Sequence, residues 1–311
     1  MKKLITNVSW LLLIILLTVS STSNAQTEQD ALMMGNKKLC IAGSFAFNTW
    51  ENYWEGEFKR DNANIGQVET KSVMLMLNYG ISNNLNLMAS LPYISTKATQ
   101  GTLSGMDGIQ DLGVFLKWRP IRLKSGHQSI SLLAVGGYSI PSQDYNIDFM
   151  PMTIGLGSEV ISGRLIADYK INKIFATVSA AYFHRNNVEI DRPAYYTDHQ
   201  INSSTVRMPD AGNFQLRTGY RDALVIAEAF LENTSTFGGF DIRKNDMPFV
   251  SNKMNSTRAG LEGKYYFRKM PALGLHANIW STIAGRNVGQ ATGVMVGADY
   301  IIDFTSTKSK K

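Results

Sequence analysis

The sequence has almost no cysteine, no long apolar run and few charged side chains. Among its 311 residues Cys40 is the single cysteine, which excludes an intramolecular disulfide framework and a zinc centre built on cysteines. The longest mainly apolar stretch, Trp10 to Val19, is far shorter than the ~18 residues of a spanning helix. Charged residues make up 18%, against roughly 25% in an average soluble domain. These absences exclude a polytopic helical membrane protein.

The first 25 residues have the order of a secretory signal. Lys2 and Lys3 precede the apolar stretch, and the small-residue site Ser23-Asn24-Ala25 follows it. We predict that residues 1–25 are a cleaved signal peptide and that a short periplasmic segment follows over residues 26–38. A signal anchor is the alternative, although its apolar core would be short for a bilayer.

The net charge of +6 comes from the two ends of the chain. Lys2 and Lys3 supply two positive charges and the tail 305–311 supplies three, which leaves about +1 for residues 26–304. A nearly neutral body removes the main support for nucleic-acid binding, and no nucleic-acid partner is predicted. We expect the lysine-rich tail to lie in the periplasm.

Beyond Leu39, apolar and polar side chains alternate with a period of two, which indicates β-strands. Between residues 70 and 80, one face carries Val73, Leu75, Leu77 and Tyr79, and the other carries Ser72, Met74, Met76 and Asn78. Twelve such segments follow one another, from residues 39–50 to residues 292–304. Aromatic residues near several segment ends are typical of the girdles at a membrane interface.

The connections between these segments are alternately short and long. Short turns are predicted near 81–84, 170–172, 220–222 and 268–271, with a longer one at 119–127. Most other connections are longer loops, near 51–66, 95–108, 141–154, 186–211 and 233–255, with a short one near 284–290. This rhythm, with an even strand number, is typical of a bacterial outer-membrane barrel.

We therefore predict an all-β fold, a transmembrane antiparallel up-and-down β-barrel of about 12 strands over residues 39–304. Lipid offers no partner to backbone N–H and C=O groups, so the sheet must close. Ten or fourteen strands are alternatives, as is a soluble secreted β-sandwich. The predicted location is the outer membrane of a gram-negative bacterium, with membrane lipid and, during insertion, the barrel-assembly machinery as partners.

Several motifs in the first third of the barrel point to a known family. They are Asn78-Tyr79-Gly80, Leu91-Pro92-Tyr93, Gly108-Ile109-Gln110-Asp111-Leu112 and Leu116-Lys117-Trp118. These stretches resemble the outer-membrane transporter family named for a MetA pathway of phenol degradation, in which a second glycine stands where this chain has Gln110. The resemblance, best over residues 70–140, implies a barrel that passes small solutes, aromatic or hydrophobic ones among them.

The last predicted strand resembles the terminal strand of outer-membrane barrels, which ends in an aromatic residue read by the assembly machinery. Tyr300, Ile302 and Phe304 fit that pattern, with Val294 and Val296 on the same face. The tail after Phe304 departs from it.

Charged side chains gather on the strand face opposite the predicted lipid face. A lipid-facing Arg or Lys costs about 2–4 kcal/mol at the midplane, so we place these charges in the lumen. They indicate either a polar passage that orients a solute or a salt-bridged interior that conducts little. The solute-path candidates are Asp111, Lys117, Arg119, Arg164, Asp168, Arg217, Glu228, Glu232, Arg258, Glu262, Lys264 and Asp299, and Asp303 shares their face.

The predicted outer loops are rich in aromatic residues. These rings could form a mouth that captures an apolar or ring-bearing solute, or they could belong to the outer girdle and pack the loops. The candidates are Trp50, Tyr53, Trp54, Tyr195, Tyr196, Phe240 and Phe249, with Phe237 nearby. Neither the loop aspartates nor His127, His199 and His276 have metal-ligand spacing, so no metal and no cofactor is predicted.

One histidine allows an enzymatic interpretation. His184 faces outward at the outer end of its strand, where an outer-membrane lipid hydrolase needs its base, but no serine matches it. We therefore predict a passive channel that carries small molecules into the periplasm, not an enzyme. A structural or surface-interaction barrel that acts through its loops is the alternative, and a lipid hydrolase is the less favoured one.

Overall fold

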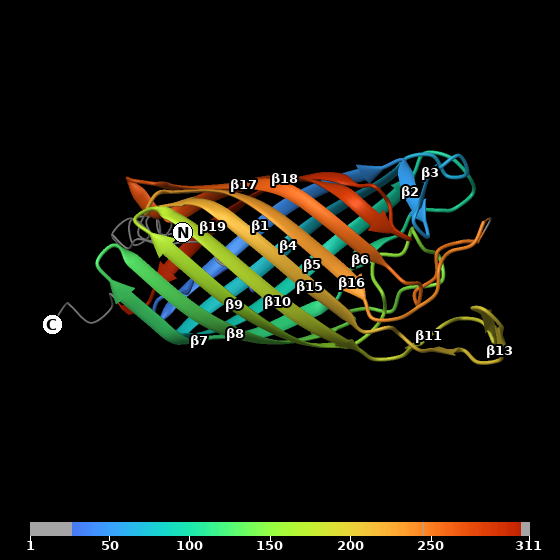
Figure 1. Cartoon of the computed structure of the whole chain (residues 1–311), viewed down its shortest axis with the longest axis horizontal. Helices are drawn as coiled ribbons and strands as arrows, with labels where there is room; N and C mark the ends of the chain where they lie inside the picture. The colour runs from blue at the N-terminus through green and yellow to red at the C-terminus, as the bar shows by residue number, and fades with distance from the viewer. Residues whose placement is uncertain (1–26, 245, 306–311) are drawn as a thin grey trace, which may run out of the picture.

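A computed structural model describes residues 27–244 and 246–305, so the predicted signal peptide and all of the tail except Thr305 lie outside the described residues. Twelve antiparallel strands form a closed barrel (Figure 1). They are β1 (Lys38–Trp50), β4 (Val68–Ser82), β5 (Leu85–Ala98), β7 (Leu112–Ser125), β8 (Gln128–Ile140), β9 (Val160–Ile171), β10 (Ile174–Arg185), β15 (Ala211–Arg221), β16 (Val225–Thr236), β17 (Asn255–Phe267), β18 (Met270–Arg286) and β19 (Thr292–Asp303). The predicted fold class and strand number are confirmed.

The barrel closes between its first and last strands. β1 pairs with β4 on one side and with β19 on the other, in an unbroken register from Lys38 opposite Asp303 to Thr49 opposite Thr292. Closure gives every wall strand two partners, which a sheet in lipid requires. No helix among the described residues is long and apolar enough to cross a membrane.

The alternation of side chains separates an apolar outside from a mixed inside. On β4, the side chains of Val73, Leu75 and Leu77 are 38–53% exposed, whereas Asn86 and Met88 on β5 are buried. A soluble sandwich would instead bury its apolar side chains between two sheets. The alternative of a β-sandwich is therefore wrong.

Strand β7 is longer than the sequence predicted. Residues 119–125 were expected in a turn, but β7 runs to Ser125 and only residues 126–127 connect it to β8. Pro120 lies in a register shift between Trp118 and Ile121, where its missing N–H interrupts the strand pairing. Outward alternation resumes at Ile121 and Leu123, which are exposed.

The long loops carry short strands and a small core of their own. The short strands are β2 (Asn52–Glu55), β3 (Phe58–Asp61), β6 (Asp107–Ile109), β11 (Val188–Glu189), β12 (Tyr195–Tyr196), β13 (Gln200–Ile201) and β14 (Thr205–Val206). A hydrophobic cluster joins the loops 141–159, 186–210 and 237–254. Its buried members are Ile147, Val188, Ile190, Tyr195, Val206, Met208, Phe249 and Val250.

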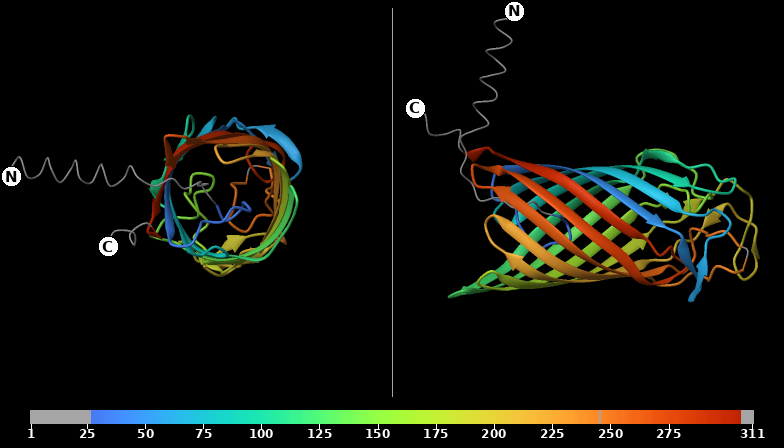
Figure 2. Two further views of the ribbon diagram at one scale, coloured as in Figure 1. Left: turned by 90° about the vertical axis from the view of Figure 1, so that its left-hand side faces the viewer. Right: turned by 90° about the horizontal axis from the view of Figure 1, so that it is seen from above.

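Residues 27–37, which we call the N-terminal segment, lie inside the barrel at the end of the short turns (Figure 2, left). Ala31 packs on Leu133 and Ile166, and Met34 packs on Cys40 and Ile301. The segment thus contacts β8 and β9 as well as β1 and β19. Of the periplasmic segment predicted over 26–38, residues 27–37 lie inside the barrel, where the inward apolar side chains of Leu133 and Ile166 pack against Ala31, and Lys38 already belongs to β1.

A glycine on β4 lets the N-terminal segment approach the wall. Lys37 N–H donates to the carbonyl of Gly80 at 2.7 Å. A Cβ atom on Gly80 would lie 2.0 Å from the carbonyl oxygen of Gly35, closer than any non-bonded contact allows. The tyrosine-glycine motif found in the sequence therefore has a packing role here.

Candidate functional site

Three cavities follow the barrel from its loop end to its turn end. We call them the mouth cavity, the central chamber and the turn-end cavity, with volumes of about 760, 370 and 280 Å³. Gln29 lines the central chamber, whereas Ala31, Leu32 and Met33 line the turn-end cavity. The N-terminal segment therefore forms the partition between these two spaces.

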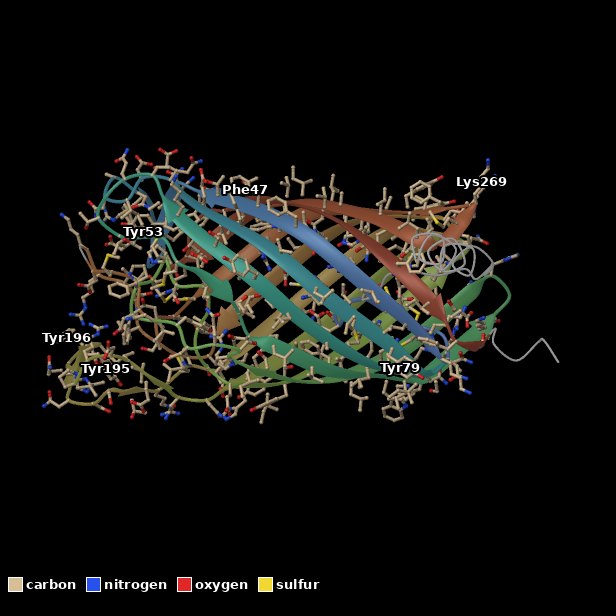
Figure 3. All side chains as sticks on the ribbon, turned by 180° about the vertical axis from the view of Figure 1, so that it is seen from behind. Phe47, Tyr53, Tyr79, Tyr195, Tyr196 and Lys269 are labelled. Atoms are coloured by element: carbon tan, nitrogen blue, oxygen red, sulfur yellow. The ribbon has the colours of Figure 1, made fainter. Side chains whose placement is uncertain are left out.

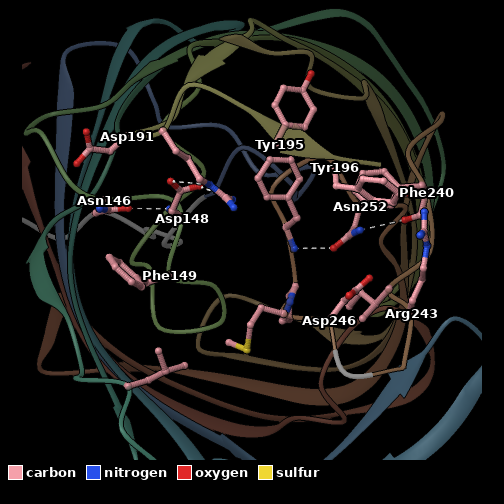
Figure 4. Close-up of a pocket in the computed structure, with 16 residues that line it drawn as sticks. Asn146, Asp148, Phe149, Asp191, Tyr195, Tyr196, Phe240, Arg243, Asp246 and Asn252 are labelled. Carbon is pink, nitrogen blue, oxygen red and sulfur yellow. Dashed lines mark hydrogen bonds and ion pairs between the residues drawn. The ribbon is translucent and has the colours of Figure 1, made fainter. Parts of the chain in front are cut away.

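The mouth cavity has aromatic walls backed by guanidinium groups (Figure 4). Tyr195 stacks on Phe249 with ring centroids 5.4 Å apart. Arg192 lies 5.3 Å over the Phe249 ring and pairs with Asp148 at 3.0 Å, while Arg243 lies 4.6 Å over the ring of Tyr196. Rings with a few polar groups are the usual lining of a small-molecule pocket.

The structure divides the predicted mouth aromatics into two groups, on different sides of the loop end (Figure 3). Tyr195, Tyr196, Phe240 and Phe249 line the mouth cavity.

The second group of aromatics is Trp50, Tyr53 and Trp54, which packs around β2. The ring centroids of Trp50 and Tyr53 are 6.4 Å apart, and Trp54 is buried against Gly285. Trp50, Tyr53 and Trp54 therefore pack the loops, as one of the two interpretations of the sequence predicted. The other four aromatic residues line the mouth cavity. Phe237 does not line the mouth cavity; it stacks on Tyr182.

Most of the predicted lumen charges form buried ion pairs. Arg217 contacts Glu228, and its Nη1 lies 3.0 Å from Glu262 Oε2, while Lys264 Nζ lies 3.1 Å from the other oxygen of Glu262. These four side chains form one cluster on β15, β16 and β17. The wall inside these strands is polar but nearly balanced in charge.

Further pairs occupy other parts of the interior. Arg221 Nη1 lies 3.2 Å from Asp168 Oδ1, and Arg258 Nη2 lies 2.7 Å from Glu232 Oε2. Asp299, buried, has His276 Nδ1 at 3.5 Å. A salt-bridged interior therefore describes most of the predicted set.

The remaining candidates lie where the wall meets loops, turns or the N-terminal segment. Lys117 Nζ pairs with Asp30 at 3.0 Å. Asp111 accepts a hydrogen bond of 2.8 Å from the hydroxyl of Tyr145, and Arg119 donates at 2.8 Å to the carbonyl of Asn83 in the β4–β5 turn. Arg164 forms no ion pair with a described residue.

Several interior residues were not predicted as candidates. Arg221 lies four residues after Arg217 on the same face of β15. The alternation of side chains, continued to the end of the strand, predicts that it faces inward. Arg185 is the last residue of β10 and lies on its inward face, so the alternation along β10 predicts its position as well. Asp30 lies outside any strand pattern, and no periodicity marks it.

Ion pairs and hydrogen bonds fix the loops over the mouth. Arg286 donates to both oxygens of Asp241, at 2.8 and 2.6 Å, and these bonds lower the pKa of Asp241 to about 2. Burial, with the neighbouring carboxylate of Asp111, raises the pKa of Tyr145 well above its usual range. At neutral pH Asp241 is therefore ionised and Tyr145 protonated, which are the states that their hydrogen bonds require, so these bonds fix the loops around the mouth.

The outward histidine has an acidic partner but no nucleophile. His184 Nδ1 lies 3.1 Å from Asp210 Oδ1, and the hydroxyl of Tyr182 also donates to that carboxylate. Within residues 27–244 and 246–305 no serine hydroxyl is hydrogen-bonded to the His184 ring. In the same range no group of three or more His, Cys, Asp or Glu side chains could hold a metal ion.

A closed antiparallel barrel with an apolar outside, charges inside and long loops at one end defines an outer-membrane type of β-barrel. The chain is similar in fold to the COG4313 outer membrane channel from Pseudomonas putida F1, with a TM-score of 0.70 and 13% identity, over 90% of this chain and 100% of that one.

Two further solved structures match less well. The NanC porin matches with a TM-score of 0.46 and 8% identity over 84% of this chain and 98% of its own. The β domain of the Bordetella autotransporter BrkA matches with a TM-score of 0.46 and 15% identity over 86% and 100%. No known protein family and no curated protein matches the sequence, so membership of the MetA-pathway family stays a prediction.

Proposed function

We propose that this protein is an outer-membrane channel through which small solutes, aromatic or hydrophobic ones among them, pass passively into the periplasm. The observation that carries the proposal is the series of three cavities along the barrel, separated at one place by the N-terminal segment. Such a path needs no chemistry and no cofactor. The fold shared with a protein described as an outer membrane channel supports the same role.

The residues that line the cavities favour a passage for small molecules over a closed interior that conducts little. The mouth cavity offers rings and guanidinium groups, which hold flat or apolar solutes weakly. Farther in, paired charges give a polar wall without a strong field of one sign. A solute can therefore be held briefly and released, as conduction requires.

The location and the export route belong to the same proposal. The exposed apolar side chains of the wall suit lipid, and the long loops would face outward with the short turns in the periplasm. Cleavage after residue 25, assembly by the barrel machinery and a periplasmic tail stay predictions. Lipid and the passing solute are the proposed partners.

Conductance measurements test the channel directly. The chain from residue 26 and the chain from residue 38, which lacks the partition, would be refolded and recorded in planar bilayers. The first should conduct in brief events and the second in larger, steadier steps. If both are folded, as shown by heat-modifiable migration, and neither conducts above the bare bilayer, the channel proposal is wrong.

A further inference from the structure

The central chamber contains a buried arginine without a carboxylate partner. Arg164 on β9 is 7% exposed, and its Nη1 donates to Ser179 Oγ at 2.9 Å and to Asn213 Oδ1 at 3.0 Å. Among the described residues no carboxylate oxygen lies within 4.0 Å of its guanidinium. The carboxylates of Glu28 and Glu232 attract the guanidinium electrostatically, but from more than 4.0 Å away.

Arg164 differs in this respect from the other buried cations of the interior. Lys117, Arg217, Arg221 and Lys264 each have a carboxylate within 4.0 Å. A buried charge without a partner is costly, because hydrogen bonds to neutral groups replace only part of its hydration. The remaining N–H groups of Arg164 can therefore gain much from an anion in the chamber.

A second arginine lines the same chamber. Arg185, at the end of β10, is half-buried and has no carboxylate within 4.0 Å among the described residues. It also lines a cavity of about 630 Å³ among the loops. Since Arg185 pairs with Val160, four residues before Arg164 on β9, the two arginines are about 13 Å apart along the strands. This is the separation of the two backbone positions; both side chains line the same chamber, so one anion between them can be reached by both guanidiniums.

None of the acidic side chains near the chamber forms an ion pair with Arg164 or Arg185. Glu232 is already paired with Arg258 at 2.7 Å and also accepts a hydrogen bond of 2.8 Å from Asn213 Nδ2. Asp111 accepts a hydrogen bond from Tyr145 but has no cationic partner. Glu28, which acts on Arg164 from beyond 4.0 Å, also has no cationic partner among the described residues, so the chamber is close to neutral overall. None of these carboxylates contacts the guanidinium of Arg164 or Arg185, and the N–H groups of both arginines stay available to an anion.

The rest of the lining is partly apolar. Phe115 and Phe183 contribute rings, and Leu156 and Val160 contribute aliphatic side chains. The volume of about 370 Å³ falls in the range of small-molecule pockets, roughly 300 to 1,000 Å³. A ligand that fits this lining has one negative group and one apolar body.

We propose that the central chamber binds small monocarboxylates whose apolar body is about the size of one ring, and selects them among the solutes that enter. Arg164 and Arg185 hold the carboxylate, and Phe115 and Phe183 contact the apolar body. The role in selection rests on the proposed channel function. The binding site itself can be tested without conduction.

Equilibrium dialysis of the refolded chain from residue 26 tests the site, with benzoate, benzyl alcohol and benzylammonium as probes of the same ring and different charge. Benzoate should bind at least tenfold more tightly than the other two. Arg164→Gln and Arg185→Gln should each weaken benzoate binding at least tenfold, while Arg164→Lys, which keeps the charge, should retain part of it. Arg268→Gln, in the exposed β17–β18 turn, is the matched control and should bind as the unchanged protein does.

Three results overturn the site: no benzoate binding, equal binding of benzoate and benzyl alcohol, or unchanged binding in both glutamine variants. Heat-modifiable migration of each variant shows that it is folded. A protein that binds benzoate through Arg164 but conducts nothing would refute the channel and keep the site. A protein that conducts but binds benzoate without Arg164 would refute the site and keep the channel.

Discussion

Lys117 on β7 is fully buried, and its Nζ lies 3.0 Å from Asp30 Oδ1 of the N-terminal segment. The same nitrogen donates at 2.8 Å to the carbonyl oxygen of Thr27. One wall residue thus binds the partition at two points. The strength of these contacts should set how often the path between the central chamber and the turn-end cavity opens.

Asp30→Ala should release the partition and increase the time that the channel spends conducting. Removing one partner of a buried ion pair costs about 3–5 kcal/mol, because the other charge stays buried alone. Single-channel recording measures the open fraction. The double variant Asp30→Ala with Lys117→Met should open less than Asp30→Ala alone, since an apolar pair often replaces a buried ion pair without loss. Asp61→Ala, in the exposed β2–β3 hairpin, is the control and should not change the open fraction.

Gly80→Ala should have a related effect through sterics instead of charge. Its Cβ would lie 2.0 Å from the carbonyl oxygen of Gly35, so the N-terminal segment must move away from β4. We expect a larger open fraction in single-channel recording. Gly136→Ala is a matched change on β8, where an added Cβ meets nothing within 4 Å, and it should conduct as the unchanged protein does. Equal traces for both variants would show that the close approach at Gly80 does not hold the partition.

The barrel could be predicted from the sequence because lipid-facing and inward-facing side chains alternate along each strand. Each strand has one lipid-facing and one inward face, so a reading with a period of two finds the wall and places Arg164, Arg217 and Glu262 inside. The end of β7 was misjudged, because residues 119–127 were predicted as a turn, whereas the strand continues through a register shift at Pro120 to Ser125.

The contents of the lumen were less predictable. Asp30 pairs with Lys117 across 87 positions of sequence, and no local pattern marks such a contact. The composition of the loops identified their aromatic residues as candidates. It does not indicate that Tyr195 lines the mouth cavity whereas Trp54 packs against Gly285. Long-range packing, not local periodicity, assembles the interior.

Arg217→Leu should destabilise the barrel wall. The guanidinium lies between Glu228 and Glu262, and without it two buried carboxylates face each other with Lys264 as the nearest cation. We expect the free energy of unfolding to fall by about 3–5 kcal/mol, measured by reversible urea unfolding in lipid vesicles. Arg60→Leu removes the partly exposed partner of Glu55 in the β2–β3 hairpin and should change it little, because water screens such pairs. A loss no larger than that of Arg60→Leu would contradict the prediction.

Acid should free the loop 237–254 within a defined pH window. The folded pKa of Asp241 is about 2, because Arg286 donates two hydrogen bonds to it and Asn287 donates a third at 2.7 Å. An unfolded aspartate titrates near pH 3.9. Since the folded pKa is the lower one, the stabilisation is complete above about pH 4 and is lost as the pH falls towards 2.

A spin label at Lys244→Cys, in a Cys40→Ala background, reports the mobility of this loop. The label should stay immobile from pH 7 to about pH 4 and become mobile between about pH 4 and pH 2, as Asp241 takes up a proton. Asp241→Asn removes the charge at every pH, so the label in that variant should be mobile already at pH 7. If the Asn variant is as immobile at pH 7 as the unchanged loop, the pair of Asp241 with Arg286 does not hold the mouth, and the contacts of Phe249 and Val250 with the other loops must do so.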